Sequence, residues 1–515
     1  MTMNTIAKLC VGDVSLNGQV TILDEDRLSY AVLNNSKGAL GVRTISKSLL
    51  NEFIDYLIKY PDRTPTEARI ELCGKTGIDK FEYGYASTLC TMAKMAISKS
   101  KNLSQLAIKE ENKHISPNDL AYISAIKTKP FIILGGFSGT GKSQKVKELA
   151  FATCPDNSHL TTSETTPGNY LLVSVKPNWH DATDIIGFRS SIHQNYYVTD
   201  FMRFLVKAMH FPNVPFFVCL DEMNLAPVEE YFADFLSVIE SRKKSENGNI
   251  VTDAIIPASV FNEEYNENFN IFESLGFERM DSELHETIVG QFIRTDLVNR
   301  LKRDGLTIPS NVIIIGTVNM DDTTNSFSRK VIDRAMTFET VVGKFGEDYF
   351  KSDVALHYVK NPLKGELFLS DEVRATQMIE EGRFILTADE QNKILSFINN
   401  INEDLEGSPF KISYRILNET ILLYRSKKRI AEIMSADGGF EDGVEFKTDL
   451  NTIFDDILMQ KILPRIEGDY EKCSKCLNKL SARAEDNEWL RSYDKIEFMI
   501  RRFGTDKSGF TSFWN

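Results

Sequence analysis

Cysteine is scarce in this chain, and its scarcity limits both compartment and chemistry. Seven cysteines occur in 515 residues. This count is too low and too scattered for a disulfide scaffold, and it fits a reducing compartment. Cys473 and Cys476 form a lone Cys-x-x-Cys without a second pair or a nearby histidine. We therefore interpret them as two residues of a helix and not as zinc ligands.

Long apolar runs and an excess of basic residues are missing as well. No apolar run reaches about 18 residues, and residues 1–20 lack the basic and apolar regions of a signal peptide. We therefore expect a cytoplasmic protein with no membrane partner. Because 60 Lys and Arg stand against 73 Asp and Glu, the net charge is −13. Any contact with DNA must then be local.

What is present is a globular composition with 42% hydrophobic and 26% charged residues. The length predicts about two to four domains. Residues 1–126 begin with β-like stretches and then become mainly helical, and residues 346–515 are predicted to be helical. Residues 127–345 contain short apolar runs between helical patterns, which is typical of buried strands in a parallel α/β sheet. These runs are residues 131–134, 171–175, 216–220 and 312–315.

A long polar stretch interrupts the α/β segment. It covers residues 241–309 and is too long for a plain loop. We expect an insertion with its own hairpin or helices.

A phosphate-binding loop follows the first apolar run. Residues 136–143 read Gly-Phe-Ser-Gly-Thr-Gly-Lys-Ser, which is a Walker A sequence placed between a predicted strand and a predicted helix. Its glycines allow backbone N–H groups to converge on a phosphate at the N-terminus of the helix. Lys142 is expected to reach the β- and γ-phosphates, and Ser143 to bind Mg²⁺. The candidate nucleotide-binding residues in this loop are Gly136, Gly139, Thr140, Gly141, Lys142 and Ser143.

A second strand ends in two carboxylates. Residues 216–222 read Phe-Phe-Val-Cys-Leu-Asp-Glu, which is a Walker B sequence. Asp221 is the candidate Mg²⁺ ligand, and Glu222 is the candidate general base that activates water. Cys219 would then be a core residue. The chain is thus predicted to be a nucleoside triphosphate hydrolase.

These motifs and the sequence around them resemble the McrB-type branch of the AAA+ superfamily. This branch supplies the nucleotide-driven motors of modification-dependent restriction systems. The resemblance covers about residue 127 to the C-terminus. It implies an α/β P-loop AAA+ core, a helical lid and a mainly helical N-terminal domain. The further segments that carry it are residues 173–181, 185–188, 221–226, 319–324, 328–335, 460–468 and 512–514.

The resemblance also implies roles for four residues. Asn319, at the end of the strand that begins near residue 311, corresponds to sensor 1, the polar residue that orients the attacking water. Arg334 is the first candidate and Arg329 the second for the arginine finger that one subunit offers to its neighbour. Arg415 lies where a lid-borne sensor 2 would contact phosphate in its own subunit. A surface salt bridge is the alternative role for each arginine.

The implied partners are other copies of the chain in a ring, a hexamer by analogy to the family, and a separate McrC-like nuclease. The N-terminal domain would recognise DNA or another trigger. This chain itself shows no convincing nuclease signature, because Glu111-Asn112-Lys113 lacks the upstream strand-borne acid that two-metal cleavage requires.

The sequence allows two substrates and two further roles. GTP-using relatives carry Asp-Arg where this chain has Asp322-Thr323, so the substrate is ATP or GTP. A MoxR- or dynein-related remodelling ATPase that never meets DNA fits the same motifs. A scaffold that binds nucleotide for assembly and scarcely hydrolyses it is a third hypothesis.

Overall fold

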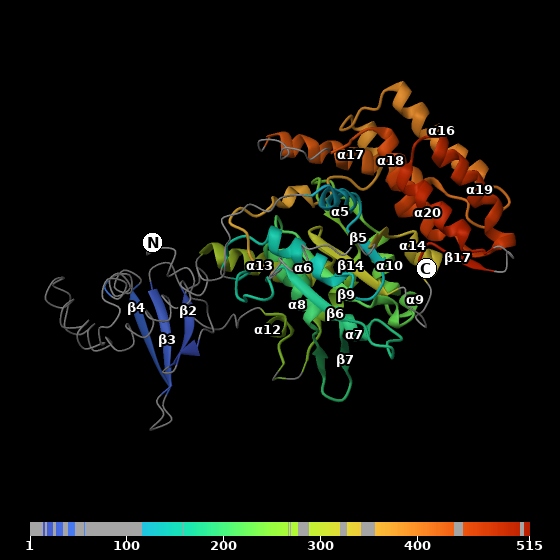
Figure 1. The fold of residues 1–515 in the computed structure, drawn as a ribbon. Coiled ribbons are helices and arrows are strands. Elements are labelled where there is room, and N and C mark those ends of the chain that lie inside the picture. Colours follow the sequence, from blue (N-terminus) through green and yellow to red (C-terminus); the bar gives the residue numbers. More distant parts are fainter. Residues whose placement is uncertain are drawn as a thin grey trace.

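The computed structural model describes the strands between residues 14 and 46, Tyr56, and most of residues 116–514 (Figure 1). In this last part, residues 158, 266, 268, 277–287, 320–326, 341–355, 437–445 and 505–508 are not described. The first strands form an antiparallel sheet in the order β1-β2-β3-β4. Their bounds are Val14–Ser15, Gly18–Leu23, Arg27–Leu33 and Leu40–Ser46. Apart from Tyr56, the helices predicted for residues 47–115 lie outside the described residues.

A five-stranded parallel sheet forms the centre of the molecule. Its order is β15-β5-β14-β9-β6, and every neighbouring pair is parallel. The strands are β5 (Phe131–Gly136), β6 (Tyr170–Ser174), β9 (Phe216–Asp221), β14 (Val312–Asn319) and β15 (Met336–Thr340). The prediction of an α/β core with a parallel sheet is therefore confirmed. All four predicted strands are present, and β15 is an additional one.

Burial across the sheet follows the position of each strand. The central strands β5, β9 and β14 are buried almost throughout, as their continuous apolar runs predict. β6 differs from the prediction of a strand buried on both faces, because its buried and exposed residues alternate and Leu172 is 47% exposed. The reason is that β6 is an edge strand, paired with β9 alone within the sheet.

Helices cover the sheet and connect its strands. α6 packs on β5, β9 and β14, and α8 packs on β6. α5 crosses the domain boundary expected at residue 126 and packs against the C-terminal helix α17. The helices from α5 to α10 are α5 (Pro117–Thr128), α6 (Lys142–Thr153), α7 (Thr183–Ile186), α8 (Asp200–His210), η2 (Met223–Leu225), α9 (Val228–Tyr231) and α10 (Ala233–Glu240). A hairpin of β7 (Phe188–Ser190) and β8 (Asn195–Tyr197) lies between α7 and α8.

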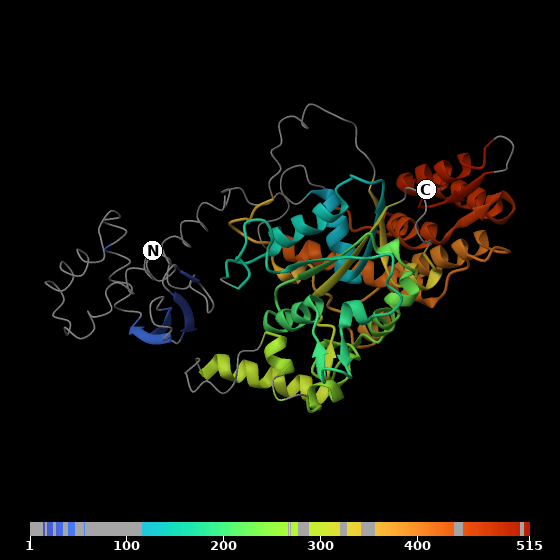
Figure 2. The ribbon, with the colours of Figure 1, turned by 90° about the horizontal axis from the view of Figure 1, so that it is seen from below.

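The stretch between α10 and β14 contains two small antiparallel pairs and several helices, and Figure 2 shows its yellow-green α13 extending from the core. Its elements are β10 (Lys243–Lys244), β11 (Ile250–Val251), β12 (Ala254–Ile256), α11 (Ala258–Asn262), α12 (Ile271–Ser274), α13 (Ile288–Asp304) and β13 (Leu306–Thr307). This is the region expected to be an insertion.

The C-terminal part is mostly helical and gathers at the upper right of Figure 1. Its elements are η4 (Gly365–Leu367), α15 (Ala375–Glu380), α16 (Ala388–Asp404), α17 (Tyr414–Ala436), α18 (Leu450–Ile457), the π-helical turn η5 (Leu458–Ile462), η6 (Leu463–Arg465), α19 (Tyr470–Asp486) and α20 (Leu490–Arg501). A two-stranded pair of β16 (Glu467–Asp469) and β17 (Phe510–Ser512) brings the chain end back to this group. Cys473 and Cys476 are buried on α19. No helix in the described part of the chain combines the length and apolarity that a membrane span needs.

Candidate active site

The strand register brings the predicted site residues to one edge of the sheet. Asn319 pairs with Gly136 across β14 and β5, and Ser174 pairs with Asp221 across β6 and β9. Because all these strands are parallel, their carboxyl ends meet at this edge, where ligands bind in open α/β sheets.

The loop between β5 and α6 has open space at two of its glycines. Gly139 and Gly141 have φ values of +79° and +75°, and a Cβ added at either would meet no atom within 4 Å. Gly136 is different: with φ of +157°, its Cβ would approach the Thr340 hydroxyl to 2.1 Å. Two glycines thus open the loop outward, and the third allows close packing beneath it. Thr140 donates a hydrogen bond to the Phe137 carbonyl at 2.9 Å.

The lysine and the serine of the loop lie at the start of α6. The Lys142 ammonium donates to the carbonyl oxygens of Gly136 at 2.9 Å and of Phe137 at 2.7 Å, and only 6% of Lys142 is exposed. The Ser143 hydroxyl donates to Asp221 Oδ1 at 2.5 Å. Walker A and Walker B are therefore in direct contact.

The second carboxylate is held by the predicted sensor residue. Asn319 Nδ2 donates to Glu222 Oε1 at 2.8 Å. Glu222 has φ of +52°, a conformation that costs energy in residues other than glycine and that clusters at functional sites. Because the backbone turns at Glu222, the two successive carboxylates accept hydrogen bonds from different side chains. Asp221 accepts from Ser143, and Glu222 accepts from Asn319.

Thr317 was not singled out from the sequence, yet it links both carboxylate residues. Its hydroxyl donates to Asp221 Oδ1 at 2.9 Å and accepts the Glu222 N–H at 3.0 Å. Thr317 is 2% exposed, on β14. The available signal was a hydroxyl in the otherwise uncharged and buried run of residues 312–318.

Thr340 is a second residue that sequence reasoning missed. It ends β15, and its hydroxyl lies 2.9 Å from that of Thr140 and donates to the Gly135 carbonyl at 3.0 Å. It therefore supports the loop from the neighbouring strand.

The residues present fit a magnesium ion carried by phosphates. Hydroxyl and carboxylate oxygens are hard ligands of the kind Mg²⁺ prefers, and triphosphatase sites supply few of them because phosphates and water complete the shell. Ser143 and Asp221 are such a pair. Within the described residues, no group of three or more His, Cys, Asp or Glu could hold a metal ion.

The three candidate arginines lie elsewhere, at the boundary between the core and the C-terminal helices. Arg334 Nη2 donates to Glu240 at 2.6 Å, and Arg415 forms an ion pair with the other oxygen of the same carboxylate. Arg329 Nη1 donates to the Pro409 carbonyl at 2.7 Å. The contacts described for Arg415 join it to Glu240 beside Arg334 and not to the phosphate-binding loop, which differs from the expected sensor 2 position.

Cys219 is a core residue of β9. Burial and the nearby Asp221 charge raise the pKa of its thiol to about 12. It therefore stays protonated and is unsuited to act as a nucleophile.

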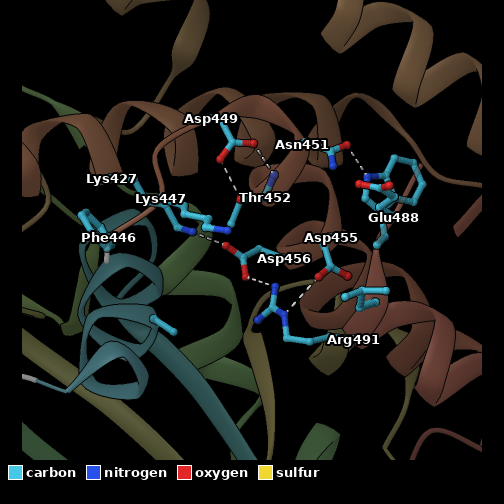
Figure 3. A pocket seen from close by; sticks show the side chains of 13 residues that line it. Lys427, Phe446, Lys447, Asp449, Asn451, Thr452, Asp455, Asp456, Glu488 and Arg491 are labelled. Carbon is cyan, nitrogen blue, oxygen red and sulfur yellow. Dashed lines mark hydrogen bonds and ion pairs between the residues drawn. The ribbon is translucent and has the colours of Figure 1, made fainter. Parts of the chain in front are cut away.

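A separate hollow of about 790 Å³ lies among the C-terminal helices (Figure 3). Its charges bind one another. Asp456 pairs with Lys427 at 2.5 Å and with Arg491 at 2.6 Å, and Asp455 pairs with Arg491 at 3.0 Å. This network joins α17, α18 and α20, and it explains the buried charges without a ligand.

Comparison with known proteins adds little beyond this geometry. A model of a domain of unknown function, DUF8727, matches residues 370–508, within the C-terminal helices. No curated protein sequence matches the chain. A crystal structure of a candidate ATPase from Cytophaga hutchinsonii is similar with a TM-score of 0.36 and 14% identity, covering 81% of this chain and 96% of that one. At this distance the likeness assigns neither fold nor function to this chain.

Proposed function

We propose that this chain is an AAA+ nucleoside triphosphatase and the motor subunit of a McrBC-like defence complex that drives a separate nuclease. One observation carries the enzymatic part. An open glycine loop, the Ser143–Asp221 pair and the Glu222–Asn319 pair lie at a single sheet edge. This is the set of groups that binding and splitting a triphosphate requires.

Each residue has a task that its contacts support. The loop N–H groups and the N-terminus of α6 hold the phosphates, and Lys142 leaves the loop carbonyls to pair with them. Ser143 and Asp221 would hold magnesium, which when bound would neutralise phosphate charge. Glu222 takes a proton from the attacking water, and Asn319 keeps the Glu222 carboxylate and that water aligned.

The finger residue would act between subunits. Arg334 of one copy would approach the γ-phosphate bound by its neighbour and stabilise charge in the transition state, an effect worth about 10³–10⁵ in rate. The chain would then work as a ring, a hexamer by analogy.

The motor role rests on the McrB-like segments of the sequence. In this proposal the N-terminal domain recognises DNA or another trigger. Nucleotide hydrolysis by the ring then drives a separate McrC-like nuclease. The substrate is ATP or GTP. A remodelling ATPase of the MoxR or dynein-related kind would share the catalytic residues and lack the nuclease partner.

The test of the enzymatic part is Glu222→Gln, which keeps the size of the side chain and removes the base. Glu229→Gln is the matched control, because Glu229 is exposed on α9. Nucleotide binding should survive in both variants, and hydrolysis should fall about 10²-fold or more in Glu222→Gln alone. Normal hydrolysis by Glu222→Gln would refute the role given to Glu222.

The test of the motor part uses the protein encoded beside this chain. Stimulated hydrolysis and a stable complex with an adjacent nuclease would support the McrBC-like role. An adjacent von Willebrand-type adaptor with the same effect would support the remodelling role instead.

A further inference from the structure

Glu240 is the last residue of α10 and binds two arginines from different parts of the chain. Oε2 accepts from Arg334, which lies between α14 (Arg329–Ile332) and β15, and Oε1 pairs with Arg415, near the start of α17. Because both oxygens belong to one carboxylate, the two guanidinium groups are neighbours. One negative charge faces two positive charges, so the cluster keeps a net positive charge.

The backbone around Arg334 is fixed by other contacts. The Lys461 ammonium, from η5, donates to the carbonyls of Ala335 at 2.7 Å and Asp333 at 3.0 Å. Arg465 pairs with Asp333 at 3.2 Å. These contacts fix the main chain around Arg334. They do not involve the Arg334 side chain, so other contacts must determine its direction.

Two partners set that direction. Arg334 Nη1 donates to the Lys330 carbonyl at 2.8 Å, and Nη2 donates to Glu240 at 2.6 Å. The Lys330 contact is local to the turn that carries Arg334. Glu240, at the end of α10, is the contact that ties the guanidinium to the core.

The surroundings favour this arrangement and keep it near solvent. The C-terminal end of a helix carries partial negative charge and attracts cations, and both guanidiniums lie at the end of α10. The Arg334, Glu240 and Arg415 side chains are 20%, 29% and 38% exposed. A net positive arginine pair at a partly exposed edge is suited to meet phosphate.

Resting on the proposed function, we infer that Glu240 is a positioning residue that holds the Arg334 guanidinium, braced by Arg415, in the direction from which it serves the phosphate site of a neighbouring copy. Glu240 itself touches neither nucleotide nor water. Its effect must therefore appear in the subunit that donates the finger and not in the subunit that hydrolyses.

Mixed rings of full-length chains test this. Glu222→Gln subunits cannot hydrolyse and can donate a finger, and Arg334→Ala subunits have an intact site and cannot donate. Each alone should be inactive, and mixing should restore hydrolysis. Glu240→Gln, which removes the charge at constant size, is then added to one partner at a time, with Glu229→Gln as control.

Restored kcat should fall at least about tenfold when Glu240→Gln is on the finger donor. It should stay within about twofold when Glu240→Gln is on the hydrolysing subunit, with KM unchanged in both mixtures. Arg415→Gln on the donor should give a smaller loss in the same direction. Equal losses in both positions, no loss, or a rise in turnover that marks Glu240 as a restraint on the finger would each overturn the inference.

The same mixtures distinguish a wrong finger assignment from a wrong role for Glu240. If Glu222→Gln and Arg334→Ala fail to restore hydrolysis while the parent chain is active, the finger assignment in the proposed function is wrong and the inference falls with it. If hydrolysis is restored and the Glu240→Gln effect does not depend on the subunit, only the inference is wrong.

Discussion

At the scale of single residues, the site contains two kinds of side chain. Some belong to short sequence motifs, and others reach the site only because neighbouring strands pair. Lys142, Ser143, Asp221 and Glu222 belong to short patterns, so their proximity could be predicted. Asn319 was predicted from a resemblance, and it contacts Glu222. Thr317 and Thr340 could not be predicted, because they meet the carboxylates and the loop only through the register of β14 and β15.

Thr317 gives the sharpest prediction at this scale. Thr317→Val removes the hydroxyl that orders Asp221 and the Glu222 backbone. We expect kcat to fall about 10–100-fold while the affinity for nucleotide changes little, because a small displacement of a catalytic group is costly. Thr317→Ser keeps the hydroxyl and should retain most activity. Steady-state kinetics check this, and equal kcat for Thr317→Val and the parent chain would refute the positioning role.

At the scale of elements, the start of α16 follows from local sequence, whereas the environment of a strand depends on the sheet around it. Thr387 and Glu390 form a capping box at the start of α16, a pattern that four consecutive residues, Thr-Ala-Asp-Glu, are sufficient to encode. β15 was missed because its sequence, Met-Thr-Phe-Glu-Thr, alternates and lacks a continuous apolar run. The exposure of β6 depends on its position at the edge of the sheet. An apolar run in the sequence does not show whether a strand lies at the edge or in the centre.

Glu390 predicts a pH dependence of α16. Hydrogen bonds from the Tyr424 hydroxyl and the Thr387 N–H lower the pKa of Glu390 from 4.5 to about 2. Because the folded pKa lies below the unfolded one, the stabilisation is complete above pH 4.5 and is lost as the pH falls toward 2. We expect Glu390→Gln to cost about 1 kcal/mol at neutral pH.

The difference in unfolding free energy between Glu390→Gln and the parent should shrink as the pH is lowered below about 5. Urea unfolding at a series of pH values measures it. A difference independent of pH would show that the carboxylate charge does not stabilise the cap.

The charge network around Asp456 predicts a large effect on stability. The Lys427 and Asp456 side chains are 6% and 3% exposed. Lys427→Met should therefore cost about 3 kcal/mol, at the low end for a broken buried pair because Arg491 still binds Asp456. The exposed pair Lys393–Asp389, with 59% and 72% exposure, is the control. Lys393→Met should leave urea unfolding nearly unchanged, and equal effects of both variants would contradict this account.

At the scale of the whole molecule, buried charges join the core to the C-terminal helices. Glu419 on α17 binds both Lys129, beside β5, and Lys461. Burial opposes the ionisation of Glu419, and the two lysines outweigh it and lower its pKa. Burial lowers the pKa of Lys461 to about 8 despite Glu419. These contacts span residues 129 to 461, so no local pattern could predict them.

If the glycine loop and the two carboxylates together bind a triphosphate with its magnesium, calorimetric titration of magnesium–ATP and magnesium–GTP detects that binding most directly. The purified parent chain should bind at least one of them, and Lys142→Ala should lose that binding by about 10²-fold or more because Lys142 is the buried cation of the loop. Binding and hydrolysis by Lys142→Ala at the level of the parent chain would contradict the account.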